Sequence, residues 1–465
     1  MSKPALRGPV HLVGVGGIHM SAIARLLRAR GLAVSGCDAV PDEARRVVEP
    51  FGVPVLGQHD PAHVAGVQTV IATAAVPPDH PELAAARAAA IPVLTRAQAV
   101  AVLVVRKRLV AVAGSHGKTT TTTAVAFLLE RAGLRPMYLI GGLPVDLPSH
   151  VTAGRGRLAV IEADEYAGAF LEYQPSVAVV TNLDADHLDY FGSVERLEEA
   201  FLEFMAHVHP DGVIWSGAGS ERLRAMLSAT HGGRRPRAPI RWFGLEHDAD
   251  WQAFDVAWLP RGGMSFALRA AARYAGRFAT PLDGLHHLRN LVGALAACSS
   301  VGVEPETLAE AVRAFHGVQR RFQRIGEAGG VLVYDDYAHH PAECAATLAA
   351  ARRRFPGARL LLLFQPHTYS RTAYLREGFR ACFSAADQLW VLETYAARET
   401  PARGLGAREL AAAIERPHAG YLATPEDAVE AVACAARPGD VCITMGAGDV
   451  TNVAPRLLER LAADA

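Results

Sequence analysis

Short apolar runs rich in β-branched residues recur along the chain, and each is followed by small or polar residues and then by a stretch with helical spacing of its apolar positions. Apolar runs without polar alternation are typical of strands buried on both faces of a parallel sheet. The runs fall into three clusters, which predicts three α/β units. In chain order, the runs are Val10–Val15, Ala33–Gly36 and Thr69–Ala72; Leu109–Ala113, Tyr138–Ile140, Ala159–Ile161 and Val177–Val180; and Val331–Tyr334, Leu360–Phe364, Leu389–Leu392 and Val441–Thr444.

Two breaks in this pattern mark the expected domain boundaries. The charged run Arg106–Arg108 stands directly before a new strand, and a helix is expected to end near Phe315–Gly317. Between Ile240 and Leu268 the pattern changes to alternating runs around Pro260–Gly263, which predicts a small antiparallel hairpin inside the middle unit. We therefore expect domains over residues 1–106, 107–316 and 317–465.

Composition narrows the class of protein. Half of the 465 residues are hydrophobic and 20% are charged, which excludes disorder as the general state. Lys+Arg and Asp+Glu both number 47, so net charge gives no reason to bind nucleic acid or a membrane surface. The longest apolar helical stretch without charge, Leu291–Val303, is too short to span a bilayer, and the first residues do not resemble a signal peptide. The scattered cysteines contain no CxxC pair and suit a reducing compartment, so we expect a soluble cytoplasmic protein; they are residues 37, 298, 344, 382, 434 and 442.

The strongest local motif joins the strand at Leu109–Ala113 to a helix through Gly114-Ser115-His116-Gly117-Lys118-Thr119-Thr120. Glycines allow the backbone amides to surround phosphate groups, the lysine neutralises outer phosphate oxygens, and the threonine hydroxyl is suited to Mg²⁺. The loop is shortened, because valine stands at position 112 and the first glycine lies two residues nearer the lysine. An ordinary strand–turn–helix is the alternative, but the chain has only three lysines (3, 107 and 118), which favours a phosphate-binding role for this one.

Polar residues follow two further strands of the middle cluster. Glu162-Ala-Asp-Glu165 ends one strand, and Asn182-Leu-Asp-Ala-Asp-His187 ends another. Ligands of open parallel sheets bind at the carboxyl ends of strands, and oxygen donors suit Mg²⁺. Glu162 and His187 are therefore candidate metal ligands, whereas most of Asp164, Glu165, Asp184 and Asp186 are expected to be solvated loop acids.

The first unit carries a partial dinucleotide fingerprint. Gly14 and Gly16 follow the first strand, and Asp38 follows the second at a suitable distance. His19 stands where the third glycine of the fingerprint is expected. The pattern therefore supports binding of a diphosphate-bearing nucleotide, but counts against NAD.

The third unit carries two polar clusters and an arginine pair. Asp335-Asp336-Tyr337-Ala-His339-His340 follows one strand, and Gln365-Pro-His367-Thr-Tyr-Ser-Arg371 follows the next. Arg320-Arg321 precedes both clusters, and a guanidinium is suited to carboxylate or phosphate. These histidines could instead have purely structural roles, and that alternative is open. A binding site is favoured because Arg371 follows His367 by four residues at the carboxyl end of a strand.

Taken together, these segments resemble the Mur ligases of bacterial cell-wall synthesis. The resemblance runs nearly end to end through GVGGIHMSAIA, GSHGKTTTT, EADEY, TNLDADHLDYFG, GVQRRF, VYDDYAHHP, LFQPHTYSRT, ETYAARE and TMGAGD, in that order. It implies an α/β fold of three domains: an N-terminal Rossmann-like domain that binds a UDP-sugar, a central P-loop ATPase with a parallel sheet plus the small hairpin, and a C-terminal Rossmann-like domain that binds the amino acid.

The resemblance also implies an activity. It is the ATP-dependent joining of L-alanine to the lactyl carboxylate of UDP-N-acetylmuramate through an acyl phosphate, in a monomer or homodimer with no nucleic-acid partner. Four alternatives are open: a ligase that attaches a recycled tripeptide to the same sugar, a folylpolyglutamate synthase, an NAD-dependent oxidoreductase and a non-enzymatic nucleotide sensor. The segment QPHTYSRT favours L-alanine over the tripeptide, and residues 10–38 are unexplained by a folylpolyglutamate synthase.

Carried over position by position, the resemblance assigns roles to named residues. Lys118 and Thr119 would bind the ATP phosphates, Thr119, Glu162 and His187 would hold Mg²⁺, and the amine's base would be among His187, Asp336, His339 and His340. The adenine-binding pattern falls on Gly284–Asn290, where His287 replaces an asparagine and Asn290 is retained. A carbamylated lysine in the central domain is excluded, because no lysine follows Lys118. The other implied contacts are Gly14, Gly16, Gly17, Asp38, Thr73, Ala74 and Ala75 for the UDP-sugar; Arg320 for ATP or the transferred phosphoryl group; and Arg321, His340, His367 and Arg371 for the substrates.

Overall fold

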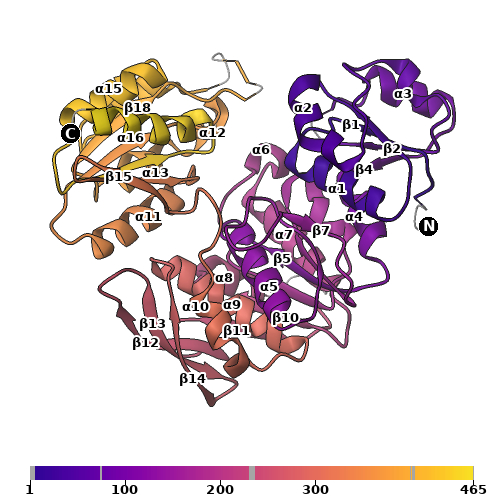
Figure 1. The fold of residues 1–465 in the computed structure, drawn as a ribbon. Coiled ribbons are helices and arrows are strands. Elements are labelled where there is room, and N and C mark those ends of the chain that lie inside the picture. The colour runs from indigo at the N-terminus through magenta and orange to yellow at the C-terminus, as the bar shows by residue number, and fades with distance from the viewer. Residues whose placement is uncertain (1–5, 74–75, 230–235, 398, 401–403, 464–465) are drawn as a thin grey trace. The chain divides into compact units, whose positions relative to one another are not determined.

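The computed structural model describes residues 6–73, 76–229, 236–397, 399–400 and 404–463, and Figure 1 shows this part of the chain with many of its secondary-structure elements labelled. Ala74 and Ala75, implied to lie by the UDP-sugar, fall outside the described residues. The strands form three sheets of four, ten and six strands. Of the helices in these ranges, none combines the length and apolar character needed to cross a bilayer.

The first sheet is parallel, with strand order β2-β1-β3-β4. Val10, Leu12 and Val13 of β1 are fully buried, as expected for a central strand covered on both faces. Helix α4 begins with a capping box between Thr95 and Gln98, which fixes its first turn. The elements are β1 (Val10–Val13), α1 (Ile18–Ala29), β2 (Val34–Cys37), α2 (Pro41–Val48), η1 (Glu49–Phe51), η2 (Pro61–Val64), β3 (Thr69–Ala72), α3 (Pro81–Ala88), β4 (Val93–Thr95) and α4 (Arg96–Val104).

The second sheet has the strand order β14-β13-β12-β11-β10-β9-β5-β8-β6-β7. Strand β5 lies between β8 and β9, and its residues Val112 and Ala113 pair with Glu162 and Val180. The carboxyl ends of these three parallel strands therefore meet at one edge of the sheet. The strands are β5 (Arg108–Ala113), β6 (Met137–Leu139), β7 (Val151–Thr152), β8 (Leu158–Glu162), β9 (Val177–Val180), β10 (Val213–Gly217), β11 (Ile240–Gly244), β12 (Trp251–Trp258), β13 (Met264–Ala270) and β14 (Arg273–Thr280).

Helices and 3₁₀ turns alternate with these strands. Ser193 and Ser220 cap helices α7 and α8 by accepting hydrogen bonds from Arg196 N and Leu223 N. The elements are α5 (Lys118–Arg131), η3 (Tyr166–Glu172), α6 (Leu188–Phe191), α7 (Val194–Ala206), α8 (Glu221–Ser228), α9 (Leu285–Ser300), η4 (Pro305–Leu308) and α10 (Ala309–Arg313).

The third sheet has the order β15-β16-β20-β17-β18-β19 and is parallel except for the pair β15–β16. Leu360, Leu362 and Phe364 of β17 belong to one hydrophobic cluster, and Leu361 and Leu363 belong to another. This parity shows that both faces of the sheet are buried, which is why the strand is apolar throughout. The elements are β15 (Gln323–Ala328), β16 (Val331–Asp336), α11 (Pro341–Arg354), β17 (Leu360–Phe364), α12 (Tyr369–Tyr374), α13 (Arg376–Cys382), β18 (Gln388–Leu392), α14 (Ala407–Ala413), β19 (Ala419–Leu422), α15 (Pro425–Ala435), β20 (Val441–Met445), η6 (Asp449–Asn452) and α16 (Val453–Ala463).

By internal contacts the chain divides into two compact units. Unit 1 comprises residues 1–256, 265–280 and 289–317, and unit 2 comprises residues 257–264, 281–288 and 318–465. The first sheet thus lies in unit 1, as does the second sheet apart from the end of β12 and the first residue of β13. The expected boundaries at residues 106 and 316 stay predictions.

The predicted hairpin around Pro260–Gly263 is present in the second sheet. Strands β12 and β13 are neighbours joined by a tight turn, in which Leu259 N donates to Gly263 O over 3.0 Å. As predicted, the hairpin lies inside the middle unit, where β11 connects it to the main sheet through its parallel pairing with β10. A further strand, β14, which the sequence pattern did not indicate, lies at the edge.

Candidate functional site

At two positions of the loop between β5 and α5, the backbone conformation and the lack of space both require glycine. Gly114 has φ +128° and Gly117 has φ +79°. A Cβ on Gly114 would lie 2.0 Å from Thr181 Oγ1, and one on Gly117 would lie 2.5 Å from Asn290 Oδ1. The loop therefore packs directly against residues that follow β9 and against helix α9, as the phosphate-loop interpretation requires of its glycines.

Residues that directly follow β9 hold this loop through hydrogen bonds. Thr181 Oγ1 donates to His116 O over 2.6 Å, and Asn182 bonds both the amide and the carbonyl of His116, at 2.8 and 3.0 Å. The hydroxyl of Ser115, itself buried, accepts from Asp184 N at 2.8 Å. Sequence reasoning did not assign Thr181 this role, although its place directly after a strand end was the available signal.

The ammonium of Lys118 lies in a cradle of acceptors, which we call the Lys118 cradle: Gly114 O, Ser115 O and the Glu165 carboxylate. Lys118 Nζ donates to Gly114 O at 2.7 Å and Ser115 O at 3.2 Å, and lies 2.8 Å from both carboxylate oxygens of Glu165. The Lys118 side chain is 13% exposed. Its ammonium is therefore held at the strand edge and does not extend into bulk solvent.

Glu165 is the residue of this site that sequence reasoning missed. The expectation of a solvated loop acid is wrong for it, because it is 1% exposed. Its Oε1 lies 3.7 Å from His187 Nε2, and Asp164, Glu165 and His187 have donor atoms close enough together to hold a cation. Asp186 is also buried, whereas the Asp184 side chain is 44% exposed and fits the expectation. No sequence signal separated Glu165 from its neighbouring acids.

Glu162 faces a different set of partners from His187. Thr119 Oγ1 donates to Glu162 Oε1 over 3.0 Å, and Gly141 N donates to Glu162 Oε2 over 2.9 Å. A hydroxyl oxygen and a carboxylate oxygen side by side are donors that Mg²⁺ prefers. Of the three residues expected to hold the metal, the structure brings Thr119 and Glu162 into contact, while His187 contacts Glu165 and Asp186.

The electrostatics of this edge show an excess of negative charge. Burial raises the pKa of Glu162 and of Glu165, against the lowering effect of the Lys118 charge. Burial would lower the pKa of Lys118, but Glu165, Asp164 and Glu162 outweigh it and raise that pKa. Lys118 thus faces three carboxylates, of which Asp164 is also paired with Arg96 at 3.0 Å. A divalent cation would offset the negative charge that remains on Glu162 and Glu165.

The glycine loop of the first sheet is organised by Asp38. Gly16 N donates to Asp38 Oδ2 over 2.8 Å, and Val40 N lies 3.2 Å from Asp38 Oδ1. Gly14 has φ +80°, and a Cβ there would lie 3.0 Å from the side chain of Thr73. Gly14, Gly16, Asp38 and Thr73 are therefore brought together, and Gly17 is the N-cap of α1.

Helix α9 carries the two residues expected to contact adenine. Asn290 is buried, and its side-chain amide lies so close to Gly117 that a Cβ atom on this glycine would collide with it. His287 is also buried, its Nδ1 lies 2.8 Å from Asp283 O, and burial lowers the pKa of His287 to about 4. The imidazole is therefore neutral at neutral pH, with one ring nitrogen already engaged.

The two polar clusters of the third sheet lie at the same edge. Asp336, in the first cluster, and Phe364, directly before the second, both pair with Met445 of the strand between them. Asp336 is fully engaged there: it accepts from Phe322 N and Ala338 N, each at 2.7 Å, and from Thr347 Oγ1 at 3.2 Å. Burial raises the pKa of Asp336 to about 6. Through these contacts, Asp336 holds the backbone of Phe322 and Ala338 at this edge of the sheet.

The arginine pair lies around the ring of Tyr337. Arg320 also bonds Asp335 at 3.1 Å and Gly446 O at 2.7 Å, so its guanidinium holds neighbouring segments together. Arg321 lies over the same ring and 3.5 Å from Glu343 Oε1. Both guanidinium groups are thus fixed at the strand edge.

Three histidines complete this edge. The ring centroids of His339 and His367 lie 5.8 Å apart. The Nδ1 atom of His367 lies 3.2 Å from Arg371 Nη1, and the His367 ring stacks on the ring of Tyr395. Burial lowers the pKa of His339 to about 3. His340 caps α11 by accepting from Ala342 N at 3.3 Å. His339, His367 and Arg371 are therefore a true cluster, whereas His340 also has a structural role.

His367 makes unit 2 sensitive to acid. Burial, followed by the Arg371 charge, lowers the pKa of His367 to about 4. The unfolded chain, with a histidine pKa of about 6.5, binds more protons below that pH, so the free energy of unfolding falls as pH drops from about 6.5 towards 4. We expect His367→Gln to flatten this slope by up to about 1.4 kcal/mol per pH unit, measured by urea unfolding across that range. The exposed His418→Gln should keep the slope; an unchanged slope in His367→Gln would contradict the account.

Comparisons with known proteins agree with these features along the whole chain. Residues 9–108 match the profile of the Mur ligase family, catalytic domain; residues 112–298 match the Mur ligase middle domain; and residues 320–448 match the Mur ligase glutamate ligase domain. The UDP-N-acetylmuramate–L-alanine ligase of Acidothermus cellulolyticus is 42% identical over 98% of this chain and 95% of its own. The chain belongs to the Mur ligase family.

Solved structures support the same assignment of the fold. The UDP-N-acetylmuramate–alanine ligase of Thermotoga maritima superposes with a TM-score of 0.80 at 25% identity, covering 98% of this chain and 99% of its own. A murein peptide ligase of Psychrobacter arcticus gives 0.72 at 26% identity, with 97% and 98% coverage. The resemblance to the Mur ligases and the three-part α/β fold expected from the sequence are both confirmed.

Proposed function

We propose that this Mur ligase joins L-alanine to the lactyl carboxylate of UDP-N-acetylmuramate and converts ATP to ADP and phosphate, in the cytoplasmic synthesis of peptidoglycan precursors. The observation that carries the proposal is the Lys118 cradle, in which a glycine loop, a lysine and buried carboxylates meet at the carboxyl ends of β5, β8 and β9. The relatedness to a UDP-N-acetylmuramate–L-alanine ligase over nearly the full length of both chains supports the substrates.

In the first step, a carboxylate oxygen of the sugar attacks the γ-phosphorus of ATP, an acyl phosphate forms, and ADP leaves. Phosphoryl transfer mainly requires alignment and neutralisation of charge. The amides of Gly114–Gly117 and the Lys118 ammonium would bind the phosphates. Asn290, which packs on Gly117, would contact the adenine of ATP together with His287. The loop Gly14–Gly17 and Asp38 would bind the UDP group.

Thr119, Glu162 and His187 would hold Mg²⁺; Thr119 and Glu162 are already in contact, and His187 lies 3.7 Å from Glu165. When bound, Mg²⁺ supplies positive charge to the phosphate oxygens at an edge that otherwise has an excess of carboxylates. The donor set fits this ion, because the oxygens of Thr119 and Glu162 are already adjacent.

In the second step, the amine of L-alanine loses a proton and attacks the acyl carbon, and phosphate leaves. Arg321, His340, His367 and Arg371 would contact the substrates, among them the carboxylate of the amino acid. Arg320 would contact ATP or the transferred phosphoryl group. Of the candidate bases, Asp336 already accepts three hydrogen bonds. The proposal for the base therefore narrows to His339, His187 and His340, of which His339 is neutral at neutral pH.

Replacing Glu162 with Gln tests the metal site. The substitution removes one anionic oxygen donor but keeps the shape of the side chain, so the Mg²⁺ concentration for half-maximal activity should rise at least about tenfold. The measurement is ADP release during a Mg²⁺ titration at saturating ATP. As a matched control, the exposed Glu221→Gln should leave the titration unchanged. An unshifted Mg²⁺ curve for Glu162→Gln would remove this residue from the site.

The experiment that tests the function is ADP release with UDP-N-acetylmuramate, compared across L-alanine, glycine, L-serine, D-glutamate and the recycled tripeptide. L-Alanine should give the highest kcat/KM. Preferential use of the tripeptide would instead support the alternative that the likeness to a murein peptide ligase favours. No ADP release with any amine would contradict a ligase. A monomer or homodimer stays the expected oligomeric state.

A further inference from the structure

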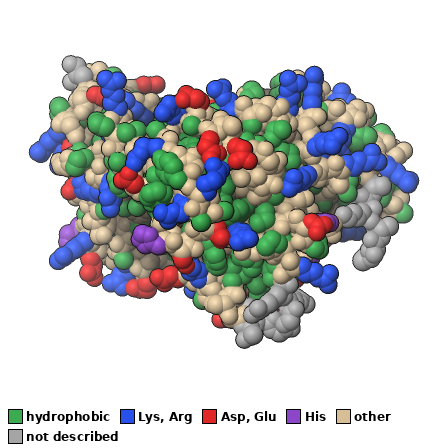
Figure 2. Space-filling model, turned by 90° about the horizontal axis from the view of Figure 1, so that it is seen from below, with side chains coloured by type: hydrophobic (Ala, Val, Ile, Leu, Met, Phe, Trp, Pro, Cys, Tyr) green, Lys and Arg blue, Asp and Glu red, His purple; other side chains and the backbone are tan. Residues whose placement is uncertain are grey.

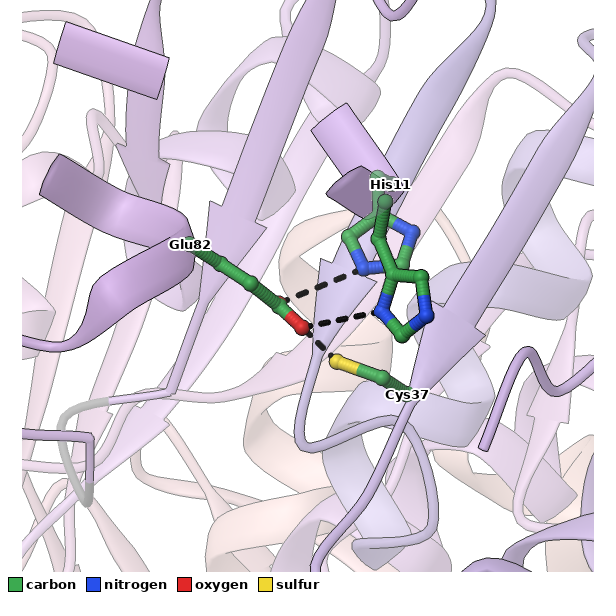
Figure 3. Close-up of side chains that lie close together, drawn as sticks. His11, Cys37 and Glu82 are labelled. Carbon is green, nitrogen blue, oxygen red and sulfur yellow. Dashed lines mark hydrogen bonds and ion pairs between the residues drawn. The ribbon is translucent and has the colours of Figure 1, made fainter. Parts of the chain in front are cut away.

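Four side chains with metal-binding atoms converge between the first sheet and the elements η2 and α3, and the proposed reaction uses none of them. His11 lies on β1, Cys37 on β2, His63 on η2 and Glu82 on α3. One donor atom from each residue lies within 4.8 Å of those of the other three. Figure 3 shows His11, Cys37 and Glu82 pointing towards one another from separate elements. We call these four residues the HCHE cluster.

The distances in the HCHE cluster suit a tetrahedral cation. Glu82 Oε2 lies 3.0 Å from Cys37 Sγ and 3.4 Å from His11 Nε2, and Glu82 Oε1 lies 3.0 Å from His63 Nδ1. Bonds of about 2.0–2.3 Å in a tetrahedral site place its donors about 3.3–3.8 Å apart. The distances from Glu82 are thus close to this spacing, and the four donor atoms all lie within 4.8 Å of one another.

Burial and neighbouring contacts orient these donors. The side chains of His11 and Glu82 are fully buried, and the Cys37 thiol is buried with them. His11 Nδ1 is engaged by Ser35 Oγ at 2.9 Å, which leaves Nε2 facing the cluster, and in the described part of the chain Nε2 has no hydrogen bond. Glu82 Oε1 also accepts from Asp60 N over 2.8 Å. Ligands held by such outer contacts are typical of protein metal sites.

The chemistry of the donors selects the class of ion. One thiolate and two imidazoles suit Zn²⁺ and related divalent transition metals, whereas Mg²⁺ prefers oxygen ligands. Four protein ligands without an open position are typical of structural sites. We propose that the HCHE cluster binds one divalent transition-metal cation, of the zinc class, and that this ion ties β1, β2, η2 and α3 together beneath the Gly14–Gly17 loop.

Binding in this site releases one proton, because Cys37 must coordinate as a thiolate. In the structure its thiol donates to Glu82 Oε2 and also lies 3.2 Å from His59 Nδ1; burial, with the adjacent Glu82 carboxylate, raises the pKa of Cys37. The cation takes the place of that proton at the same pair of atoms. The carbonyl of Cys37 accepts from Gly14 N at 2.9 Å and Val15 N at 3.0 Å, so an ion on Cys37 is coupled to the glycine loop.

Cobalt(II) provides the test, because a cysteine thiolate bound to it gives a charge-transfer absorption that oxygen and nitrogen ligands alone do not. The full chain, stripped with a chelator and kept reduced, is titrated with Co²⁺ in excess Mg²⁺, which occupies the ATP-linked metal site. We expect one Co²⁺ per chain with this band and the visible spectrum of tetrahedral cobalt, and its displacement by one equivalent of Zn²⁺. A titration of the wild-type chain that gives no thiolate band would overturn the proposal.

Two variants and one control locate the site. Cys37→Ser should lose the charge-transfer band, and His63→Gln should keep a weakened band with at least tenfold lower Co²⁺ affinity. Cys434→Ser, at an exposed cysteine, should behave like the wild type. Circular dichroism checks that each variant folds, and if Cys37→Ser does not, the wild-type and His63→Gln titrations decide. Retention of the full band in folded Cys37→Ser, or unchanged affinity in His63→Gln, would contradict the assignment.

Discussion

Replacing Lys118 with Arg is expected to lower kcat/KM by at least about 10²–10³-fold although the charge is kept. Three acceptors converge on the single Nζ atom, namely Gly114 O, Ser115 O and the Glu165 carboxylate, at 2.7–3.2 Å. A planar guanidinium distributes its donors over a larger fork and cannot bring them to the one point that the cradle provides. The measurement is steady-state ADP release, together with the thermal unfolding midpoint of the variant.

The matched control is Lys107→Arg, at the other lysine within the described residues. Lys107 Nζ makes one hydrogen bond, to Gly156 O at 2.7 Å, which a guanidinium can also make. We expect its activity to stay within about twofold of the wild type, because the change lies outside the phosphate loop. Near wild-type turnover in Lys118→Arg would remove Lys118 from the reaction.

The second large effect is expected for Gly114→Ala. The φ of +128° is unfavourable for alanine, and the new methyl group would lie 2.0 Å from Thr181 Oγ1 and 2.9 Å from Thr181 N. Backbone strain of about 1–3 kcal/mol adds to this collision, so the unfolding midpoint should fall by about 5 °C or more. Since Thr181 and Asn182 also hold His116, the loop amides should move and activity should be lost.

Gly133→Ala is the control for that substitution. Gly133 also has a left-handed backbone, with φ +79°, but a Cβ there meets nothing within 4 Å. It should cost about 1–2 kcal/mol of stability and leave the kinetics unchanged. Equal losses of activity in the two variants would show that the packing of Gly114 on Thr181 is not what shapes the loop.

Much of the fold could be predicted because its central strands are buried on both faces. Thr69–Ala72, Val177–Val180 and Leu360–Phe364 are observed with the bounds that their apolar runs predicted. Several of the missed strands are short or partly exposed: β19 has one exposed and three half-buried residues, and β7 has two residues. Strand β10 was also missed, although four of its five residues are buried. Their pairing depends on neighbouring strands, which a local pattern does not record. For the same reason, the sequence did not indicate that β11 pairs with β10.

The site was predicted less completely than the fold. Glycine, lysine and threonine in the loop have a recognisable spacing, so Gly114, Gly117, Lys118 and Thr119 could be identified from the chain alone. Glu165 could not, because Asp164 and Glu165 are adjacent acids and only the turn after β8 decides which one faces Lys118. In the same way, the mixed charges on the face in Figure 2 fit the zero net charge, but do not indicate any site.

The central claim is that the phosphates held at Lys118 react with a carboxylate to form an acyl phosphate. UDP-N-acetylmuramate with ¹⁸O in its lactyl carboxylate tests it directly, with ATP, Mg²⁺ and L-alanine present. When the amine displaces phosphate, the C–O bond breaks and the carboxylate oxygen leaves on phosphorus. Mass spectrometry of the released phosphate should therefore find one ¹⁸O atom per turnover. Unlabelled phosphate, or release of AMP in place of ADP, would contradict the account.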